Sequence, residues 1–409
     1  MSKKAAVAAA LLFALTSSRA FASEFTLSGV TAGDIKASQL IIPAPAAPLK
    51  EWTIMAFLNG NNNLEHHAIT KLSDMEDVGS SDRVNIVAEL GKTKGSTNDG
   101  QQWSGSRRYY LTADGMEYGF SSRPVQELGT ADMGDWRHLA DFVKWAKMNY
   151  PAKKYMLIVF GHGSSWMSMD KPLTKGMLYD DESGNHVTSV ELRKVFETAG
   201  PVDLLFMDSC LMQDLSALYE IRKHAAVVVG SQDTIQANGV MYKFSLKRVR
   251  EQPEMTAEEA AEFMIFPGGR DSGIAQPVFT LSAVRTAALG KLASRLDTLA
   301  ARLLAGRLAD YRAARDAAFR PDADYSFQGD LGHFLKALGT SADTAVRGAA
   351  GEAFDILSNE TVLYNHAADK EKEYGLSAYL PAKKFKKEFR ALSFAEDTRW
   401  DDLAGAGIK

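Results

Sequence analysis

The chain has 409 residues, a formal net charge of −4 and a hydrophobic content of 45%. This length and composition suffice for one large folded domain or two. A mildly acidic chain without a basic run is not expected to bind nucleic acid. A single cysteine excludes an internal disulfide, so the stability of the fold must come from its hydrophobic core.

The N-terminal residues have the pattern of a secretory signal peptide. Lys3 and Lys4 precede eleven apolar residues, 5–15, and Ala22 is a small residue at which cleavage would occur. Eleven apolar residues are too few to cross a bilayer core, which takes about 20. We therefore expect residues 1–22 to be removed, which lowers the formal charge to −7. The mature protein is then exported, to the periplasm or the medium, without stable membrane insertion.

The central part of the chain predicts an α/β fold. Residues 23–50, polar and then rich in Pro and Ala, predict an extended linker. In residues 51–285, short apolar runs alternate with amphipathic helices, which predicts a mainly parallel sheet flanked by helices. Apolar residues at positions 139, 142, 143 and 146 share one helical face, near whose start Asp135 lies. The predicted strands are Thr53–Leu58, Val84–Leu90, Tyr155–Phe160, Val202–Met207 and Ala225–Val229.

The C-terminal region, residues 286–409, is predicted to be rich in helices. Ala, Leu and Arg dominate residues 287–315, which favours long helices. A strand-like run, Gly375–Leu380, follows later and is stopped by Pro381. The pattern leaves open whether this region forms a separate domain or extends the same sheet.

The candidate catalytic residues are His162 and Cys210. Each follows a predicted strand, and sites in such sheets lie outside the carboxyl ends of the strands. Their separation of 48 residues is close to the roughly 50 of caspases. A thiol with a nearby histidine can act as a nucleophile with its base, and the backbone N–H groups of Gly163 and Cys210 could form an oxyanion hole. The alternative is an inert, buried core cysteine.

Asp208 is a candidate substrate-binding residue. It lies two residues before the cysteine and so on the same face of an extended chain, where a carboxylate would favour a Lys or Arg side chain. The alternative is a structural acid that caps the following turn.

No metal site is predicted from the sequence. His66 and His67 lack the spacing of metal ligands, and residues 61–63 are interpreted as a turn. The acidic segment 180–184 could bind a cation but is interpreted as a solvated loop.

Together these residues resemble the clostripain family of cysteine peptidases, which belongs to the clan of caspases, legumains and gingipains. The resemblance extends from Trp52 to about Asp402. It implies a caspase-like α/β fold, a dyad of His162 and Cys210, and cleavage after Arg or Lys with Asp208 in the pocket. The motifs that carry it are Asn62-Asn63-Leu64-Glu65, Met133-Gly134-Asp135, Tyr150-Pro151, Gly161-His162-Gly163-Ser164 with Trp166, Asp208-Ser209-Cys210-Leu211-Met212 and Tyr374-Gly375-Leu376-Ser377.

The resemblance also implies processing and a second pocket residue. Family members are typically cut between the histidine and the cysteine, and here Lys171 and Lys175 are the candidate self-cleavage sites. Some members depend on calcium, although nothing in this sequence requires a cofactor. Residues 231–235 resemble the family's specificity loop, and Asp233 is a candidate pocket residue. Gln232 replaces a commonly acidic position in that loop, and the aromatic residue and proline that usually follow are missing.

The sequence therefore predicts an exported cysteine endopeptidase acting on proteins or peptides that contain Arg or Lys. One alternative is a catalytically silent periplasmic binding module with the same fold. Another is a Cys-His amidase or transpeptidase that uses the same acyl-enzyme chemistry. The sequence determines neither the natural substrate, nor a choice between Arg and Lys, nor the oligomeric state.

Overall fold

The computed structural model describes residues 49–96, 103–113, 120–168, 175–278, 280–320 and 327–408. Leu49–Lys409 form one compact unit. The predicted signal peptide and most of the predicted linker lie outside the described residues. Lys50, at the end of that linker, is already the first residue of a strand.

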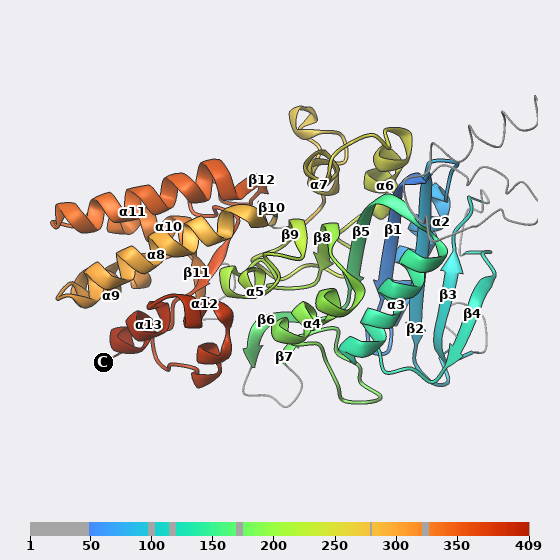
Figure 1. Cartoon of the computed structure of the whole chain (residues 1–409), viewed down its shortest axis with the longest axis horizontal. Helices are drawn as coiled ribbons and strands as arrows, with labels where there is room; N and C mark the ends of the chain where they lie inside the picture. The colour runs from blue at the N-terminus through green and yellow to red at the C-terminus, as the bar shows by residue number, and fades with distance from the viewer. Residues whose placement is uncertain are drawn as a thin grey trace, which may run out of the picture. The chain divides into compact units, whose positions relative to one another are not determined.

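A nine-stranded sheet with the strand order β12-β10-β9-β8-β5-β1-β2-β3-β4 forms the centre of this unit (Figure 1). Its five middle strands are parallel, and all five were predicted. The antiparallel strands at both edges were not predicted. The predicted α/β class, with a mainly parallel sheet, is confirmed. The middle strands are β1 (Lys50–Leu58), β2 (Val84–Lys92), β5 (Ala152–Phe160), β8 (Val202–Asp208) and β9 (Ala225–Gly230), and the edge strands are β3 (Gly105–Tyr110), β4 (Pro124–Gly129), β10 (Leu281–Arg285) and β12 (Val362–His366).

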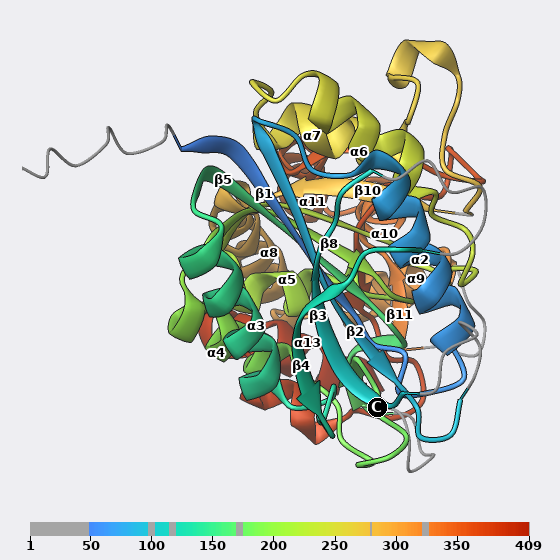
Figure 2. The same ribbon diagram turned by 90° about the vertical axis from the view of Figure 1, so that its right-hand side faces the viewer.

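Helices cover both faces of the sheet because side chains along each middle strand alternate between two apolar cores. In β5, Leu157 and Val159 lie in one core, and Met156 and Ile158 lie in the other. Asp135 caps the predicted helix as expected, by accepting a hydrogen bond from a backbone N–H of the first turn. The first core is shared with α3 (Trp136–Asn149), α4 (Ser189–Ala199) and α5 (Leu215–Glu220), and the second with α2 (Glu65–Val78), α6 (Tyr242–Glu251) and α7 (Ala257–Ile265) (Figure 2).

The C-terminal region contains the predicted long helices and also contributes to the sheet. Strand β12 pairs with β10 and so extends the nine-stranded sheet. The strand predicted at Gly375–Leu380 forms β13 (Ser377–Tyr379), which pairs instead with β11 (Gln328–Asp330) in a separate two-stranded sheet. Within the described residues, no helix is long and apolar enough to span a membrane. The helices of this region are α8 (Leu289–Leu304), α9 (Leu308–Ala317), α10 (Leu331–Leu338), α11 (Thr344–Ile356), α12 (Ser393–Asp397) and α13 (Trp400–Ile408).

Candidate active site

The pairing of β5 with β8 brings His162 and Cys210 together. These strands are parallel neighbours, and Phe160 at the end of β5 pairs with Asp208 at the end of β8. His162 and Cys210 each lie two residues beyond that last pair. Both line one cavity of about 210 Å³. The sequence-based prediction that the two side chains meet at the carboxyl edge of the sheet therefore agrees with the structure.

The backbone around the cysteine is closely packed and sharply turned. A Cβ atom at Gly163 would lie 2.7 Å from the carbonyl oxygen of Cys210 and 2.8 Å from the Cβ of Ser209, so only glycine fits there without a shift. Leu211 has a φ of 61°, in the left-handed region that branched residues rarely adopt. Its N–H donates to the carbonyl oxygen of Asp233 at 3.0 Å. The loop after β9 thus supports the turn that presents the thiol.

The sulfur of Cys210 is held by the same loop. The backbone N–H of Ile235 donates to the sulfur at 3.3 Å, and the sulfur lies 3.7 Å from the carbonyl oxygen of Ile235. The cysteine is half-buried rather than enclosed in the core. The N–H favours a thiolate and the carbonyl oxygen favours a thiol that donates to it, because a hydrogen bond favours the protonation state that can form it. These features disfavour the interpretation of Cys210 as an inert core residue.

His162 is oriented by Asn63, which the sequence placed in a turn and in a family motif without assigning it a role. Nε2 of His162 lies 2.7 Å from Oδ1 of Asn63. An amide oxygen only accepts hydrogen bonds, so Nε2 carries the proton and Nδ1 is left as the acceptor of the neutral ring. The strand register could have indicated this contact: β1 pairs with β5 through Leu58 and Phe160, so the loops that follow both strands leave the sheet together.

The surroundings of His162 favour the neutral form of its imidazole. Burial lowers its pKa from the ordinary value of 6.5, and the carboxylate of Asp181 acts in the opposite direction with a smaller effect. Because the lowering prevails, the ring is mostly unprotonated at neutral pH. A neutral ring with a free lone pair is the form that a general base requires.

Asp208 lines the cavity, as predicted, but its carboxylate is also paired inside the protein. The residue is 3% exposed. Its Oδ2 accepts a hydrogen bond from the hydroxyl of Tyr242 at 2.6 Å and lies 3.5 Å from Nζ of Lys71. The sequence did not indicate either partner, because α2 and α6 are distant from β8 along the chain. A role for Asp208 in substrate binding stays a prediction.

Of the other candidates, Asp233 does not line the cavity, and the two lysines fall in or beside an interval that the structure does not describe. Asp233 is not among the cavity residues; its Oδ1 accepts a hydrogen bond from the N–H of Thr234 at 2.6 Å, while Ile235 of the same loop does line the cavity. Lys171 lies outside the described residues. Lys175 begins β7 (Lys175–Met177), which pairs with β6 (Gly163–Ser168) directly after the histidine.

The acidic loop 180–184 is exposed at residues 181–184, as predicted for a solvated loop, but its first residue has a structural role. Asp180 is 1% exposed. Among the described residues, no group of three or more His, Cys, Asp or Glu side chains is arranged to hold a metal ion. Calcium dependence stays a prediction. The carboxylate of Asp180 accepts hydrogen bonds from four groups, the backbone N–H groups of Met133, Glu182 and Ser183 and the side-chain amide of Asn61.

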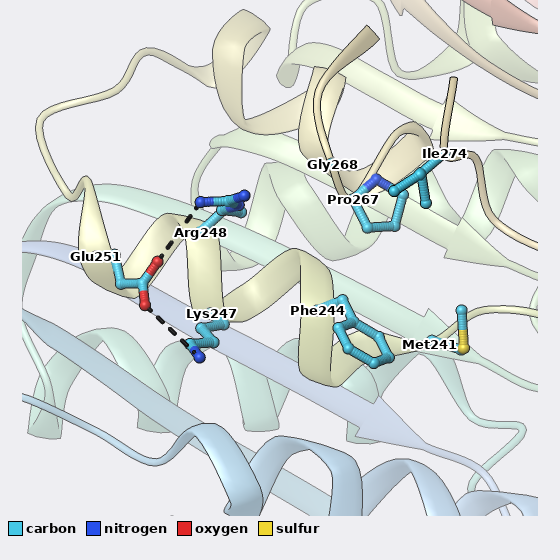
Figure 3. A pocket seen from close by; sticks show the side chains of 8 residues that line it. All are labelled: Met241, Phe244, Lys247, Arg248, Glu251, Pro267, Gly268 and Ile274. Carbon is cyan, nitrogen blue, oxygen red and sulfur yellow. Dashed lines mark ion pairs between the residues drawn. The ribbon is translucent and has the colours of Figure 1, made fainter. Parts of the chain in front are cut away.

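A larger cavity, of about 460 Å³, lies between α6 and residues 267–274 (Figure 3). Phe244 and Ile274 are exposed beside it. Glu251 forms ion pairs at its rim with Lys247 and Arg248, at 3.9 and 3.8 Å. The residues that line it include no thiol or histidine, and its Lys247 and Glu251 are engaged in these ion pairs. The smaller cavity at His162 and Cys210 is therefore the candidate active site.

Comparison with known proteins identifies relatives of this chain. The model of the Clostripain family matches residues 56–405. Clostripain of Hathewaya histolytica is 25% identical over 220 residues, which are 48% of this chain and 42% of that protein. The match thus spans less than half the length of this curated relative.

Two solved structures share the fold at low sequence identity. A secreted C11 cysteine protease from Bacteroides thetaiotaomicron, in complex with an irreversible peptide inhibitor, has a TM-score of 0.61 and 16% identity, and the match covers 86% of this chain and 99% of that one. An inactive zymogen C11 protease from Parabacteroides distasonis has a TM-score of 0.60 and 15% identity, with 86% and 98% covered. Likenesses at this identity show a common fold.

The contact between Asn63 and His162 predicts a change in thiol reactivity. In Asn63→Ala the ring loses the acceptor that fixes its orientation, so alkylation of Cys210 by iodoacetamide at pH 7 should slow by roughly tenfold. Intact-mass kinetics measure this rate without interference, since the chain has one cysteine. Asn63→Asp is the comparison variant: it keeps an acceptor oxygen and adds a charge that favours the imidazolium, so it should react at least as fast as the unmodified chain. Equal rates in all three proteins would contradict a positioning role.

The lowered pKa of His162 can be measured directly. Proton NMR of the Cys210→Ala variant should give His162 a pKa below 6.5, with its signal assigned by difference against His162→Gln. Asp181→Asn should lower this pKa further, because the Asp181 carboxylate stabilises the imidazolium. A pKa at or above 6.5, or a rise in Asp181→Asn, would contradict the electrostatic description of the site.

Proposed function

Because this chain belongs to the clostripain family, we propose that it is an exported cysteine endopeptidase that cleaves peptide bonds after Arg or Lys. One observation carries the proposal: His162 and Cys210 occupy equivalent positions beyond the paired ends of β5 and β8 and line the same cavity. An inert cysteine in the same fold would need neither a histidine with a free lone pair nor an N–H directed at its sulfur. The proposal makes the protein a hydrolase that forms an acyl-enzyme.

The first half of the reaction forms the acyl-enzyme. Nδ1 of His162 takes the proton of the Cys210 thiol, and the sulfur attacks the carbonyl carbon of the scissile peptide. Negative charge then develops on the carbonyl oxygen. The backbone N–H groups of Gly163 and Cys210 would donate to that oxygen. When the carbon–nitrogen bond breaks, His162 returns the proton to the leaving amine, and the substrate's acyl group stays on the sulfur as a thioester.

The second half of the reaction is hydrolysis of the thioester. His162, neutral again, takes a proton from a water molecule, and the resulting hydroxide attacks the thioester carbon. The sulfur leaves as a thiolate and recovers the proton from the imidazolium. The new carboxylic acid is released, so each cycle consumes one water molecule and regenerates the dyad. An amine in place of water would give transpeptidation by the same steps.

Substrate choice and location follow from the charged residues and the N-terminal pattern. Asp208 in the cavity lining supports a preference for Arg or Lys before the cleaved bond, and Asp233 would act only through its charge at longer range. The basic and apolar N-terminal pattern supports export, to the periplasm or the medium. We propose proteins or peptides as substrates, no nucleic-acid partner and no required cofactor, with calcium tested as an activator.

Cleavage of short peptides tests this function. The chain from Ser23 onward should release a fluorophore from peptides ending in Arg or Lys but not from a matched peptide ending in Asp, because the Asp208 carboxylate can pair with a cationic side chain and not with an anionic one. Assays run with and without calcium. Cys210→Ala should lose at least about a thousandfold in kcat/KM, since the nucleophile is absent. Rapid alkylation of Cys210 without cleavage of any peptide would favour the binding module, and an amine-dependent ligated product would favour the transpeptidase.

Self-processing is a separate expectation. The intact mass of the purified protein should show a cut after Lys171 or Lys175 that is missing in Cys210→Ala. The double variant Lys171→Ala/Lys175→Ala keeps the dyad and should stay uncut. A cut that persists in Cys210→Ala would assign the processing to another protease, without bearing on the peptide assay.

A further inference from the structure

Lys71 is a buried cation directly beneath the candidate substrate pocket. It lies in the middle of α2, and its side chain is 2% exposed. Its ammonium group donates a hydrogen bond to the carbonyl oxygen of Val240 and lies 3.5 Å from Oδ2 of Asp208. The same nitrogen lies 4.7 Å from the ring centroid of Tyr242 and 5.8 Å from that of Phe160. Lys71 is thus enclosed by a carbonyl, a carboxylate and two aromatic rings.

This arrangement neutralises the carboxylate on which a basic substrate side chain would depend. Lys71 supplies one positive charge against the one negative charge of Asp208, and Tyr242 adds a neutral hydrogen bond to the same Oδ2. Both groups of the ion pair are removed from solvent, so water screens their charges little. Burial would make an unpaired carboxylate costly here, which explains why the fold supplies an internal partner.

Asp74, one turn along α2 from Lys71, is a further acid near this ion pair. Burial raises the pKa of Asp74, and the positive charge of Lys71 acts against that rise. Asp77, one turn further, is paired with Lys243 at 2.7 Å. At the Asp208 carboxylate itself, the negative charge is offset by the contact with Lys71.

An Arg or Lys side chain of a substrate would meet this ion pair as a second cation. To reach Asp208 it must approach a carboxylate that Lys71 already contacts, and two cations on one buried carboxylate repel each other. An uncharged side chain of similar length fills the same cavity without that repulsion. Resting on the proposed peptidase function, we propose that Lys71 is a specificity-determining residue, an internal counter-ion that weakens the preference for Arg or Lys and admits uncharged side chains such as Met or Gln.

The test compares kcat/KM for matched fluorogenic peptides that differ only in a terminal Arg or Met. The unmodified enzyme should prefer Arg by less than about tenfold. Lys71→Met removes the charge at nearly constant length and should raise the Arg-to-Met ratio by at least about tenfold, because Asp208 becomes available to the substrate. Lys71→Arg keeps the charge and should leave the ratio within about threefold. An unchanged ratio in Lys71→Met would overturn the inference.

A second pair of variants keeps the test decisive if Lys71→Met fails to fold. Asp208→Asn leaves Lys71 as an unpaired cation, so the Arg-to-Met ratio should fall at least about tenfold. Lys71→Met/Asp208→Asn removes both charges and should restore most of that ratio, whereas a bystander Lys71 would leave the double variant equal to Asp208→Asn. If the unmodified enzyme cleaves neither peptide, the proposed function is overturned as well. If cleavage depends on Cys210 but the Arg-to-Met ratio does not change when Lys71 is substituted, only this inference is overturned.

Discussion

The parallel pairing of β5 with β8 is the constraint on which the candidate site depends. Each strand is buried on both faces, so a slip of one residue would exchange the side chains of one core with those of the other. The core therefore fixes the register in which Phe160 pairs with Asp208. His162 and Cys210 inherit that register two residues later. Their proximity is a consequence of hydrophobic packing in the sheet.

Loops at the carboxyl edge of the sheet supply hydrogen bonds to His162 and Cys210 that the strand register alone does not provide. Asn63 reaches His162 from the loop after β1, and Ile235 reaches the sulfur from the loop after β9. These loops leave the sheet at the same edge because β1, β5, β8 and β9 all run in one direction. A parallel sheet thus collects groups from four separate loops at one place, and each is supported by a strand that cannot shift without disturbing the core.

The strands and the dyad could be predicted from the sequence because their signals are local. Each middle strand is a short apolar run, and the predicted boundaries differ from the observed ones by a few residues at most, as for β5, predicted from Tyr155 and observed from Ala152. The edge strands were missed for the same reason: β4 alternates weakly and is largely exposed, so no apolar run marks it. Asp208 was predicted from its position two residues before the cysteine and the family resemblance added Asp233, and the structure places only Asp208 in the cavity lining.

Asn63 and Lys71 could not be found in this way, because their roles depend on pairing between distant segments. Lys71 lies on a helix whose other buried positions include Ile69 and Leu72, and sequence pattern alone gives no reason to bury a lysine among them. Its partner Asp208 is 137 residues away along the chain. The positions of His162 and Cys210 are fixed by strand register, whereas the charge of the pocket is fixed by the packing of α2 and α6 against the sheet. Substitutions on those helices can therefore change which substrate side chain is accepted while leaving the nucleophile and its base in place.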